Sequence, residues 1–230
     1  MTKPDVRVIC FPHIGAGASL YNEWAERLPH GAELCAVRLP ARENRLDEQP
    51  IEDLPDLLDT LGSVLAPVTK GRFVLFGHCS GSMLAFHFAR WLRAHGREQP
   101  ELLAVSSIEA PSVRVIESPL HQMPRDELFE RVMSFGGMEA GILADPEMMD
   151  IFEPMLRADC RLVERISYAP EPPLDIPIVV AGGMHDTLVS YESMAAWRWE
   201  TTRSFSMHMY ATDHFVLEES AELIGALLRP

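Results

Sequence analysis

The sequence lacks the cysteine patterns that hold metal ions or form redox centres. Its 230 residues contain only four cysteines, with no Cys-x-x-Cys pair and no Cys/His spacing typical of a metal site. We therefore predict no bound metal ion, and scattered thiols of this kind fit a reducing cytoplasm. The four cysteines are Cys10, Cys35, Cys79 and Cys160.

Long apolar runs and an excess of positive charge are also missing. No segment reaches the length of an uncharged membrane span, and the stretch from Met1 to Asp5 does not have the pattern of a signal peptide. We therefore expect no membrane association and no secretory signal. The formal net charge of −14 argues against nucleic-acid binding. With no internal repeat, the 230 residues suit one domain with a full core, which we expect to be monomeric.

The most informative stretch is an apolar segment, Phe73–Phe76, that runs into a Gly-x-Cys-x-Gly motif at residues 77–81. A helix-like run follows it. This is the pattern of a nucleophile elbow, with Cys79 where serine is usual. In such a turn the central residue has a strained backbone, and the glycines leave room where side chains would collide. The central side chain projects at the positive end of the following helix, which favours a thiolate and a tetrahedral oxyanion.

Two other interpretations of this motif have to be weighed. Ser80 is a less favourable nucleophile because its own flanking residues, His78 and Ser82, are not glycines. A lone cysteine near a strand is also often only a small buried core residue. We predict that Cys79 is the nucleophile because residues elsewhere in the chain supply its partners.

Apolar strands alternate with helical segments along most of the chain. Strands are predicted at residues 6–11, 32–37, 73–76, 102–108, 178–181 and 205–210, and helices at 21–28, 51–65, 82–92 and 218–228. This alternation predicts an α/β fold with a mostly parallel central sheet and helices on both faces. In such sheets, ligands bind at the carboxyl ends of the strands.

One block of helical character breaks the alternation. Pro124 and Pro146 each begin a predicted helix, and Gly136-Gly137 ends the first. An insertion after a central strand lies over the active site, so we predict a helical lid over roughly residues 112–172. Its methionines, Met155 among them, either line the substrate site and adapt to varied apolar chains or fill the core of the lid itself.

A nucleophile needs a base, and the base needs an orienting acid. Asp186 lies in the loop after the strand at 178–181, and His214 lies in the loop after the strand at 205–210. The chain order nucleophile, acid, histidine is that of α/β-hydrolases. We therefore predict an α/β-hydrolase fold with a Cys79–Asp186–His214 triad, against the alternatives of a turn aspartate and a surface histidine.

Other residues compete for these roles. Asp213 is a rival acid, although its position beside His214 in the chain makes a side-chain approach difficult. His185, His78 and His13 are rival bases, and we expect His13 to line the site without transferring protons. The Gly-rich loop after the first strand suggests that the backbone N–H groups of Ile14 and Ser80 form the oxyanion hole. The alternative for that loop is a plain glycine-rich turn.

Further motifs complete the pattern. They are Cys10-Phe11-Pro12-His13, Leu39-Pro40 followed by Arg42 and Arg45, Phe76-Gly77-His78, Leu156-Arg157-Ala158-Asp159, Gly182-Gly183 and Asp213-His214-Phe215. Together they make the chain resemble, over nearly its whole length, the type II thioesterases that accompany polyketide synthases and non-ribosomal peptide synthetases. The resemblance implies the same triad and no cofactor. It also implies acyl, aminoacyl or peptidyl substrates held as thioesters on the phosphopantetheine arm of a carrier protein.

The chain departs from this family at three places. The usual nucleophile there is serine rather than Cys79, Ser80 replaces a bulkier apolar residue, and Ile14 and Ala16 alter the small-residue loop. Three functions follow as hypotheses. The first is hydrolysis of carrier-bound thioesters, the second is transfer of the acyl group from Cys79 to another carrier thiol or an amine, and the third is a non-catalytic carrier-binding module.

A basic group follows the second predicted strand. Arg38, Arg42 and Arg45 lie near the expected mouth of the site. Carriers of this type are usually acidic, so we expect these side chains, Arg42 in particular, to contact the carrier or the phosphopantetheine phosphate. The alternative is ordinary solvated surface charge.

Overall fold

The computed structural model describes residues 4–116, 118–135 and 145–229 of the chain. Within these residues, six parallel strands form one sheet in the order β2-β1-β3-β4-β5-β6. Each predicted strand is present, with small differences at its ends. The strands are β1 (Val6–Phe11), β2 (Ala32–Ala36), β3 (Phe73–His78), β4 (Leu102–Ser106), β5 (Ile178–Gly183) and β6 (Phe205–Tyr210).

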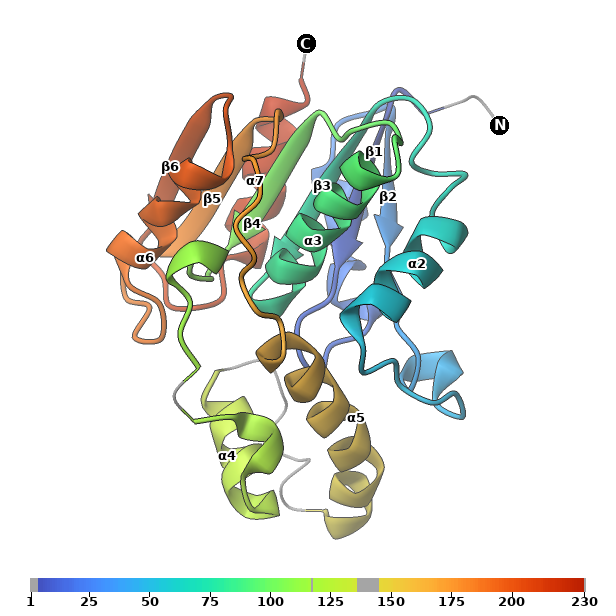
Figure 1. The fold of residues 1–230 in the computed structure, drawn as a ribbon, viewed down its shortest axis with the longest axis vertical. Coiled ribbons are helices and arrows are strands. Elements are labelled where there is room, and N and C mark those ends of the chain that lie inside the picture. The colour runs from blue at the N-terminus through green and yellow to red at the C-terminus, as the bar shows by residue number, and fades with distance from the viewer. Residues whose placement is uncertain (1–3, 117, 136–144, 230) are drawn as a thin grey trace.

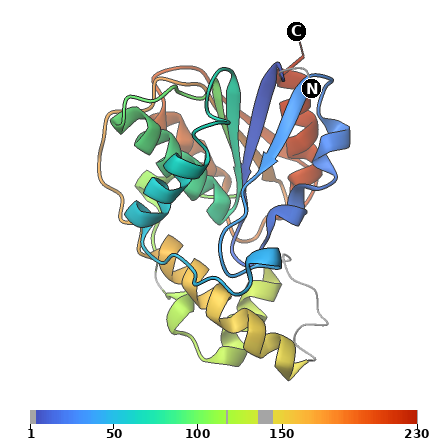
Figure 2. The same ribbon diagram turned by 90° about the vertical axis from the view of Figure 1, so that its right-hand side faces the viewer.

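Helices cover both faces of the sheet, as Figures 1 and 2 show. One face packs against α2 (Leu54–Val64) and α3 (Ser80–Ala94), and the other against α1 (Trp24–Arg27) and α7 (Leu217–Leu227). The residues of β3 and β4 are buried throughout, which explains why these strands are continuous apolar runs. The predicted α/β-hydrolase architecture is confirmed.

Shorter helices connect these elements. They are the 3-10 helices η1 (Ala18–Tyr21), η2 (Glu43–Arg45), η3 (Pro111–Val113), η4 (Leu120–Gln122) and η6 (Ala196–Glu200), and the short α6 (Tyr191–Ala195). None of the helices within the described ranges is both long and apolar enough to cross a membrane.

Two further helices, α4 (Arg125–Ser134) and α5 (Pro146–Glu164), lie beyond the carboxyl ends of the strands (Figures 1 and 2). They start where the sequence predicts. Proline opens α5, and the Asp145 side chain accepts hydrogen bonds from two N–H groups of its first turn. The predicted end of α4 at Gly136-Gly137 lies outside the described residues. The boundaries 112–172 and the role of a lid stay predictions.

The two helices have an apolar core of their own, separate from the two clusters that flank the sheet. Its buried residues are Ala41, Leu128, Phe129, Val132, Met149, Met155, Leu156 and Cys160, and Ile14 packs against it. Because Ile14 belongs to the loop after β1, this core joins the α4–α5 unit directly to the edge of the sheet where ligands are expected.

Candidate active site

Cys79 lies in the sharp turn between β3 and α3. Its backbone angles, φ 48° and ψ −127°, fall in a region that costs energy for any residue with a side chain. The flanking glycines make the turn possible, because a Cβ atom on Gly77 would overlap the backbone of Gly81, and one on Gly81 would overlap the carbonyl of Phe11. The Cys79 N–H donates to the Ser106 carbonyl at 2.8 Å, which fixes the turn against β4. The backbone is that of a nucleophile elbow.

The structure brings the predicted acid and base into contact. His214 Nδ1 lies 2.8 Å from Asp186 Oδ2, and the Asp186 side chain has no exposed surface. The other carboxylate oxygen accepts the N–H groups of Leu188 at 2.8 Å and Val189 at 3.2 Å. Because a carboxylate only accepts hydrogen bonds, Nδ1 carries a proton and Nε2 is the nitrogen left for proton transfer.

The charges of this group support one another. Burial lowers the pKa of His214, but the hydrogen bond to Asp186 and the nearby sulfur of Cys79 outweigh burial and raise the pKa to about 9. Burial also raises the pKa of Asp186, and this effect is outweighed by hydrogen bonds from His214 and from the two backbone N–H groups, which lower it. The site therefore stabilises an imidazolium ion between a carboxylate and the Cys79 sulfur.

The rival acid and one rival base lie apart from this group. Asp213 is exposed, and its carboxylate accepts the N–H of Phe215 at 3.2 Å within its own loop. His185 is also exposed, and the partner of its N–H is the Thr212 carbonyl. Neither contacts the ring of His214 among the interactions described.

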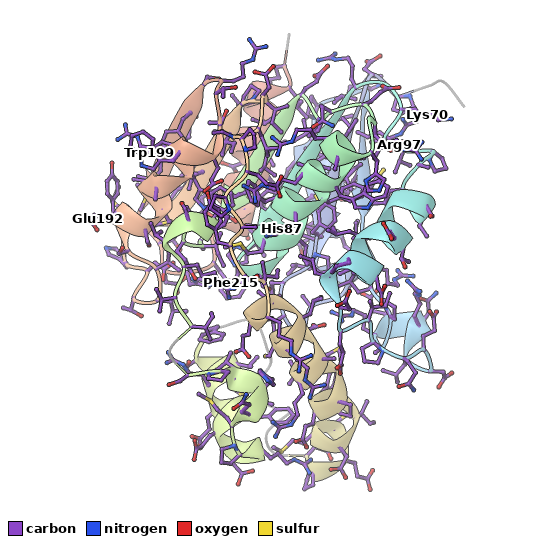
Figure 3. The ribbon with its side chains drawn as sticks, viewed as in Figure 1. Lys70, His87, Arg97, Glu192, Trp199 and Phe215 are labelled. Carbon is purple, nitrogen blue, oxygen red and sulfur yellow. The ribbon has the colours of Figure 1, made fainter. Side chains whose placement is uncertain are left out.

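His13 and His78 form a packed aromatic cluster with His214 and Phe215. Phe215, labelled in Figure 3, has its ring centre 5.5 Å from that of His13 and 4.8 Å from that of His78. Burial lowers the pKa of His13 to about 4 and the pKa of His78 well below its usual value. Both rings are therefore neutral near pH 7. His13 does not line the large cavity described below, so its predicted contact with substrate is not seen, and it supports the His214 loop instead.

The predicted oxyanion hole is only half open. The Ser80 N–H belongs to the first turn of α3 and has no acceptor within the described residues. The Ile14 N–H, however, already donates to the side-chain oxygen of Ser80 at 2.8 Å. The predicted role of the Ile14 N–H as a direct oxyanion donor is therefore corrected, because the Ser80 side chain already accepts this N–H group.

Arg42 does not lie on the surface as predicted. Its side chain is 4% exposed and pairs with Asp159 of α5, with Nη2 2.7 Å from Oδ1 and Nη1 3.0 Å from Oδ2. Nη1 also donates to the Ala16 carbonyl at 2.8 Å, and Asp159 Oδ2 accepts the Gly15 N–H at 2.9 Å. The carrier-docking role of Arg42 is wrong. The buried pair ties the loop after β1 to helix α5.

Asp159 is a site residue that residue-by-residue reasoning missed. The sequence shows it as part of the Leu156-Arg157-Ala158-Asp159 motif. An acidic residue between the apolar positions of an amphipathic helix indicates a buried ion pair. The neighbouring arginines do not replace Arg42 as free cations. Arg38 pairs with Glu43, and Arg45 pairs with Glu48.

A cavity of about 680 Å³ opens above the triad. Cys79, Ser80, Ile14 and His214 are among the residues that line it. The rest of the lining consists of apolar side chains, the hydroxyl residues Ser107, Ser118 and Thr187, and four charged residues, Glu109, Arg114, Arg131 and Glu164. Met123 contributes to this lining, but Met155 is 2% exposed within the α4–α5 core. The interpretation of Met155 as a substrate contact is therefore wrong. The Met155 side chain fills the core of the α4–α5 unit instead.

The size and lining of the cavity match a small-molecule site. Its volume lies in the range of ligand pockets, roughly 300–1,000 Å³. Among the residues that the structure describes, no group of three or more His, Cys, Asp or Glu side chains is arranged to hold a metal ion. The chemistry available at this site is nucleophilic attack by Cys79, proton transfer by His214 and stabilisation of an oxyanion at the start of α3.

Comparison with known proteins identifies the family. The family model of the thioesterase domain matches residues 6–229. The chain belongs to the thioesterase family. As a member it is a thioester hydrolase, and Cys79, Asp186 and His214 follow one another in the chain order that α/β-hydrolases use for nucleophile, acid and base.

Relatives of this thioesterase come from biosynthetic pathways. It is 35% identical over 215 residues to the gramicidin S biosynthesis protein GrsT of Aneurinibacillus migulanus, covering 94% of this chain and 84% of GrsT. The RedJ thioesterase of the prodiginine pathway of Streptomyces coelicolor superposes with a TM-score of 0.89 at 32% identity, over 98% of this chain and 89% of RedJ. The type II thioesterase BorB of the borrelidin cluster gives a TM-score of 0.86 at 31% identity, over 97% and 91%.

Proposed function

We propose that this thioesterase removes acyl, aminoacyl or peptidyl groups from the phosphopantetheine arm of a carrier protein, through a covalent intermediate on Cys79. The observation that carries the proposal is the position of Cys79, at a strained elbow in one cavity with His214 and its partner Asp186. The relatives GrsT, RedJ and BorB are named for such biosynthetic pathways, which supports a carrier of a polyketide synthase or peptide synthetase as the partner.

Acylation begins when the Cys79 thiol passes its proton to Nε2 of His214 and the sulfur attacks the carbonyl carbon of the thioester. A tetrahedral intermediate forms, and the N–H of Ser80 donates to its oxyanion. The carbon–sulfur bond to pantetheine then breaks, and the imidazolium of His214 protonates the departing thiolate. A raised His214 pKa suits this step, because the proton is already on the ring when the leaving group needs it.

Deacylation uses the same residues in the opposite sense. Neutral His214 removes a proton from water, the hydroxide attacks the acyl carbon, and Cys79 leaves as the thiol after the ring returns the proton. Thioester and water give carboxylic acid and thiol, so atoms and protons balance. Asp186 holds the ring and stabilises its charged form in both half-reactions.

Transfer to a second acceptor is the other candidate. The observation that favours it is the sulfur of Cys79 itself, because a cysteine acyl-enzyme is a thioester and keeps the activation of the group it carries. A thiol or amine that enters the cavity accepts the group as readily as water does. The non-catalytic module has less support, since the Asp186–His214 hydrogen bond is intact at 2.8 Å.

Two further predictions, the cellular compartment and the lid, belong to this proposal. All four cysteines are unpaired, which supports the reducing cytoplasm as the compartment. The α4–α5 unit borders the cavity through Arg131 of α4 and Glu164 of α5, which supports its role as a lid that controls the access of water and acceptors.

The test compares wild type with Cys79→Ser and Cys79→Ala on one acylated carrier protein, with and without an added thiol or amine. Intact-protein mass spectrometry of the carrier and quantification of free acid separate hydrolysis from transfer. We expect Cys79→Ser to keep some hydrolysis and lose transfer, and Cys79→Ala to lose both. If wild type and Cys79→Ser both give only free acid whatever the acceptor, transfer is ruled out and hydrolysis stands.

A further inference from the structure

The side chain of Ser80 has an unusual position in this site. It is the residue directly after Cys79, at the start of α3, and only 3% of its surface is exposed. Its oxygen accepts the Ile14 N–H at 2.8 Å, and Ser80 lines the cavity together with Cys79 and His214. The hydroxyl therefore lies between the loop after β1 and the start of α3, on the cavity wall that it shares with Cys79 and His214.

The hydroxyl group has one hydrogen-bonding role that is not filled. A serine oxygen accepts hydrogen bonds and donates one O–H. Here the oxygen accepts from Ile14, and in none of the hydrogen bonds found among the described residues does the Ser80 O–H act as donor. A buried donor without a partner is costly, and it regains a partner when a negatively charged oxygen forms beside it.

We infer that the Ser80 hydroxyl is a catalytic oxyanion donor that replaces the N–H of Ile14. In this arrangement the tetrahedral oxyanion accepts two hydrogen bonds from the same residue, one from the Ser80 N–H and one from its O–H. The inference rests on the proposed acyl-enzyme chemistry and names a residue that acts in it.

The Ile14 N–H acts through the hydroxyl rather than on the oxyanion. An N–H that donates to a hydroxyl oxygen polarises the O–H, so the second hydrogen bond becomes stronger. An oxyanion bound by this O–H lies about 2.7 Å beyond the Ser80 oxygen. While the hydroxyl is present, it therefore lies between the Ile14 N–H and the oxyanion.

The first test is Ser80→Ala in the full-length enzyme. We expect its rate of Cys79 acylation to fall by roughly 10²–10³-fold, as for the loss of one oxyanion-hole donor, with little change in KM. Acetyl, alanyl and octanoyl thioesters of pantetheine serve as substrates, and quenched-flow mass spectrometry measures the acylated protein. An acylation rate equal to or above that of wild type overturns the inference, because the hydroxyl would then only block Ile14.

A matched pair of variants separates the effect of the hydroxyl group from the effect of side-chain shape. Ser80→Thr and Ser80→Val add similar volume, but only threonine keeps the O–H. We expect the threonine variant to acylate at least tenfold faster than the valine variant, with equal Tm values. Equal rates would count against the donor. Ser63→Ala is the control for loss of a serine hydroxyl, since Ser63 lies exposed on α2 and its hydroxyl bonds only to Asp59.

Binding of octanal gives a readout that does not need turnover. The Cys79 sulfur adds to the aldehyde carbon, and the proton moves to the new oxygen, which gives a hemithioacetal in the oxyanion site. Protection of Cys79 from iodoacetamide measures its affinity. We expect Ser80→Ala to weaken octanal binding at least tenfold while leaving the affinity for octanoyl-pantetheine amide unchanged. Equal octanal affinity contradicts the inference, whereas a wild type that no thioester acylates contradicts the proposed function instead.

Discussion

Replacing Arg42 with methionine tests the buried ion pair that joins the loop after β1 to helix α5. The substitution removes the guanidinium that makes two hydrogen bonds to Asp159, one to the Ala16 carbonyl and one to the Pro40 carbonyl. Asp159 is then left buried, with the Gly15 N–H as its remaining partner among the hydrogen bonds described. The variant therefore carries an uncompensated charge in the interior.

The size of the effect follows from this burial. Removing one partner of a buried pair costs about 3–5 kcal/mol. For a protein of this length, 1 kcal/mol changes Tm by about 2–4 °C, so we expect a fall of roughly 6–20 °C. Turnover falls as well at temperatures where the variant is folded, because the loop that carries Gly15 and Ala16 loses its attachment.

Differential scanning calorimetry and carrier-dependent kinetics measure the two effects. Arg72→Met is the matched control, since Arg72 makes a similar two-bond pair with Glu101 but on the surface, and its Tm is expected to change little. The double substitution Arg42→Met, Asp159→Leu should recover most of the stability. An Arg42→Met enzyme with wild-type Tm and a raised KM for carrier-bound substrate alone would refute this reasoning and restore the docking role.

Three further predictions concern the triad. Iodoacetamide should label Cys79 first, because burial raises the pKa of each of the other three thiols, and peptide mapping that finds another cysteine labelled sooner would contradict this. The His214 pKa of about 9 lies above the usual 6.5, so the contribution of His214 to stability is complete below pH 6.5 and is lost as the pH rises through 9. NMR titration should show a lower His214 pKa in Cys79→Ala than in wild type. An equal pKa in the two proteins would mean that the sulfur has no influence on the ring. Asp186→Asn should reduce turnover roughly 10²–10⁴-fold with its Tm measured in parallel, and wild-type turnover in a folded variant would exclude Asp186 as the orienting acid. The other three cysteines are Cys10, Cys35 and Cys160.

The strands and the triad were predictable because they depend on local patterns and chain order. Buried parallel strands read as continuous apolar runs, and the residues that end β5 and β6 have to meet at the same edge of the sheet. Asp186 and His214 follow from that rule without any knowledge of the side-chain contacts. The strain at Cys79 follows from the two glycines that flank it.

The errors concern side chains whose partners are distant in the sequence. Arg42 was expected on the surface because a charged residue usually lies there, and nothing near it indicates a partner 117 residues away in α5. Helical spacing placed Met155 on an apolar face but does not tell whether that face meets a cavity or another helix. The contact between Ser80 and Ile14 has no local signal, since it depends on how closely the loop approaches α3.

The region from Tyr191 to Glu200 shows that short helices can also escape prediction from the sequence. It forms α6 and η6, which were not predicted, because the segment is short and its apolar residues follow no single period. Trp199 is 70% exposed, whereas Trp197 is fully buried and donates to the Ile108 carbonyl at 3.1 Å. Tertiary contacts rather than periodicity decide the structure of this segment.

The central claim is the covalent acyl group on Cys79. The most direct measurement mixes acylated carrier protein with the His214→Ala variant and with wild type, stops the reaction in acid, and maps the acyl group by peptide mass spectrometry. We predict an acyl group on the Cys79 peptide in both proteins, which persists longer in the variant because deacylation lacks its base. Free acid formed by wild type with no acyl group ever found on Cys79, together with undiminished turnover of Cys79→Ala, would contradict the account.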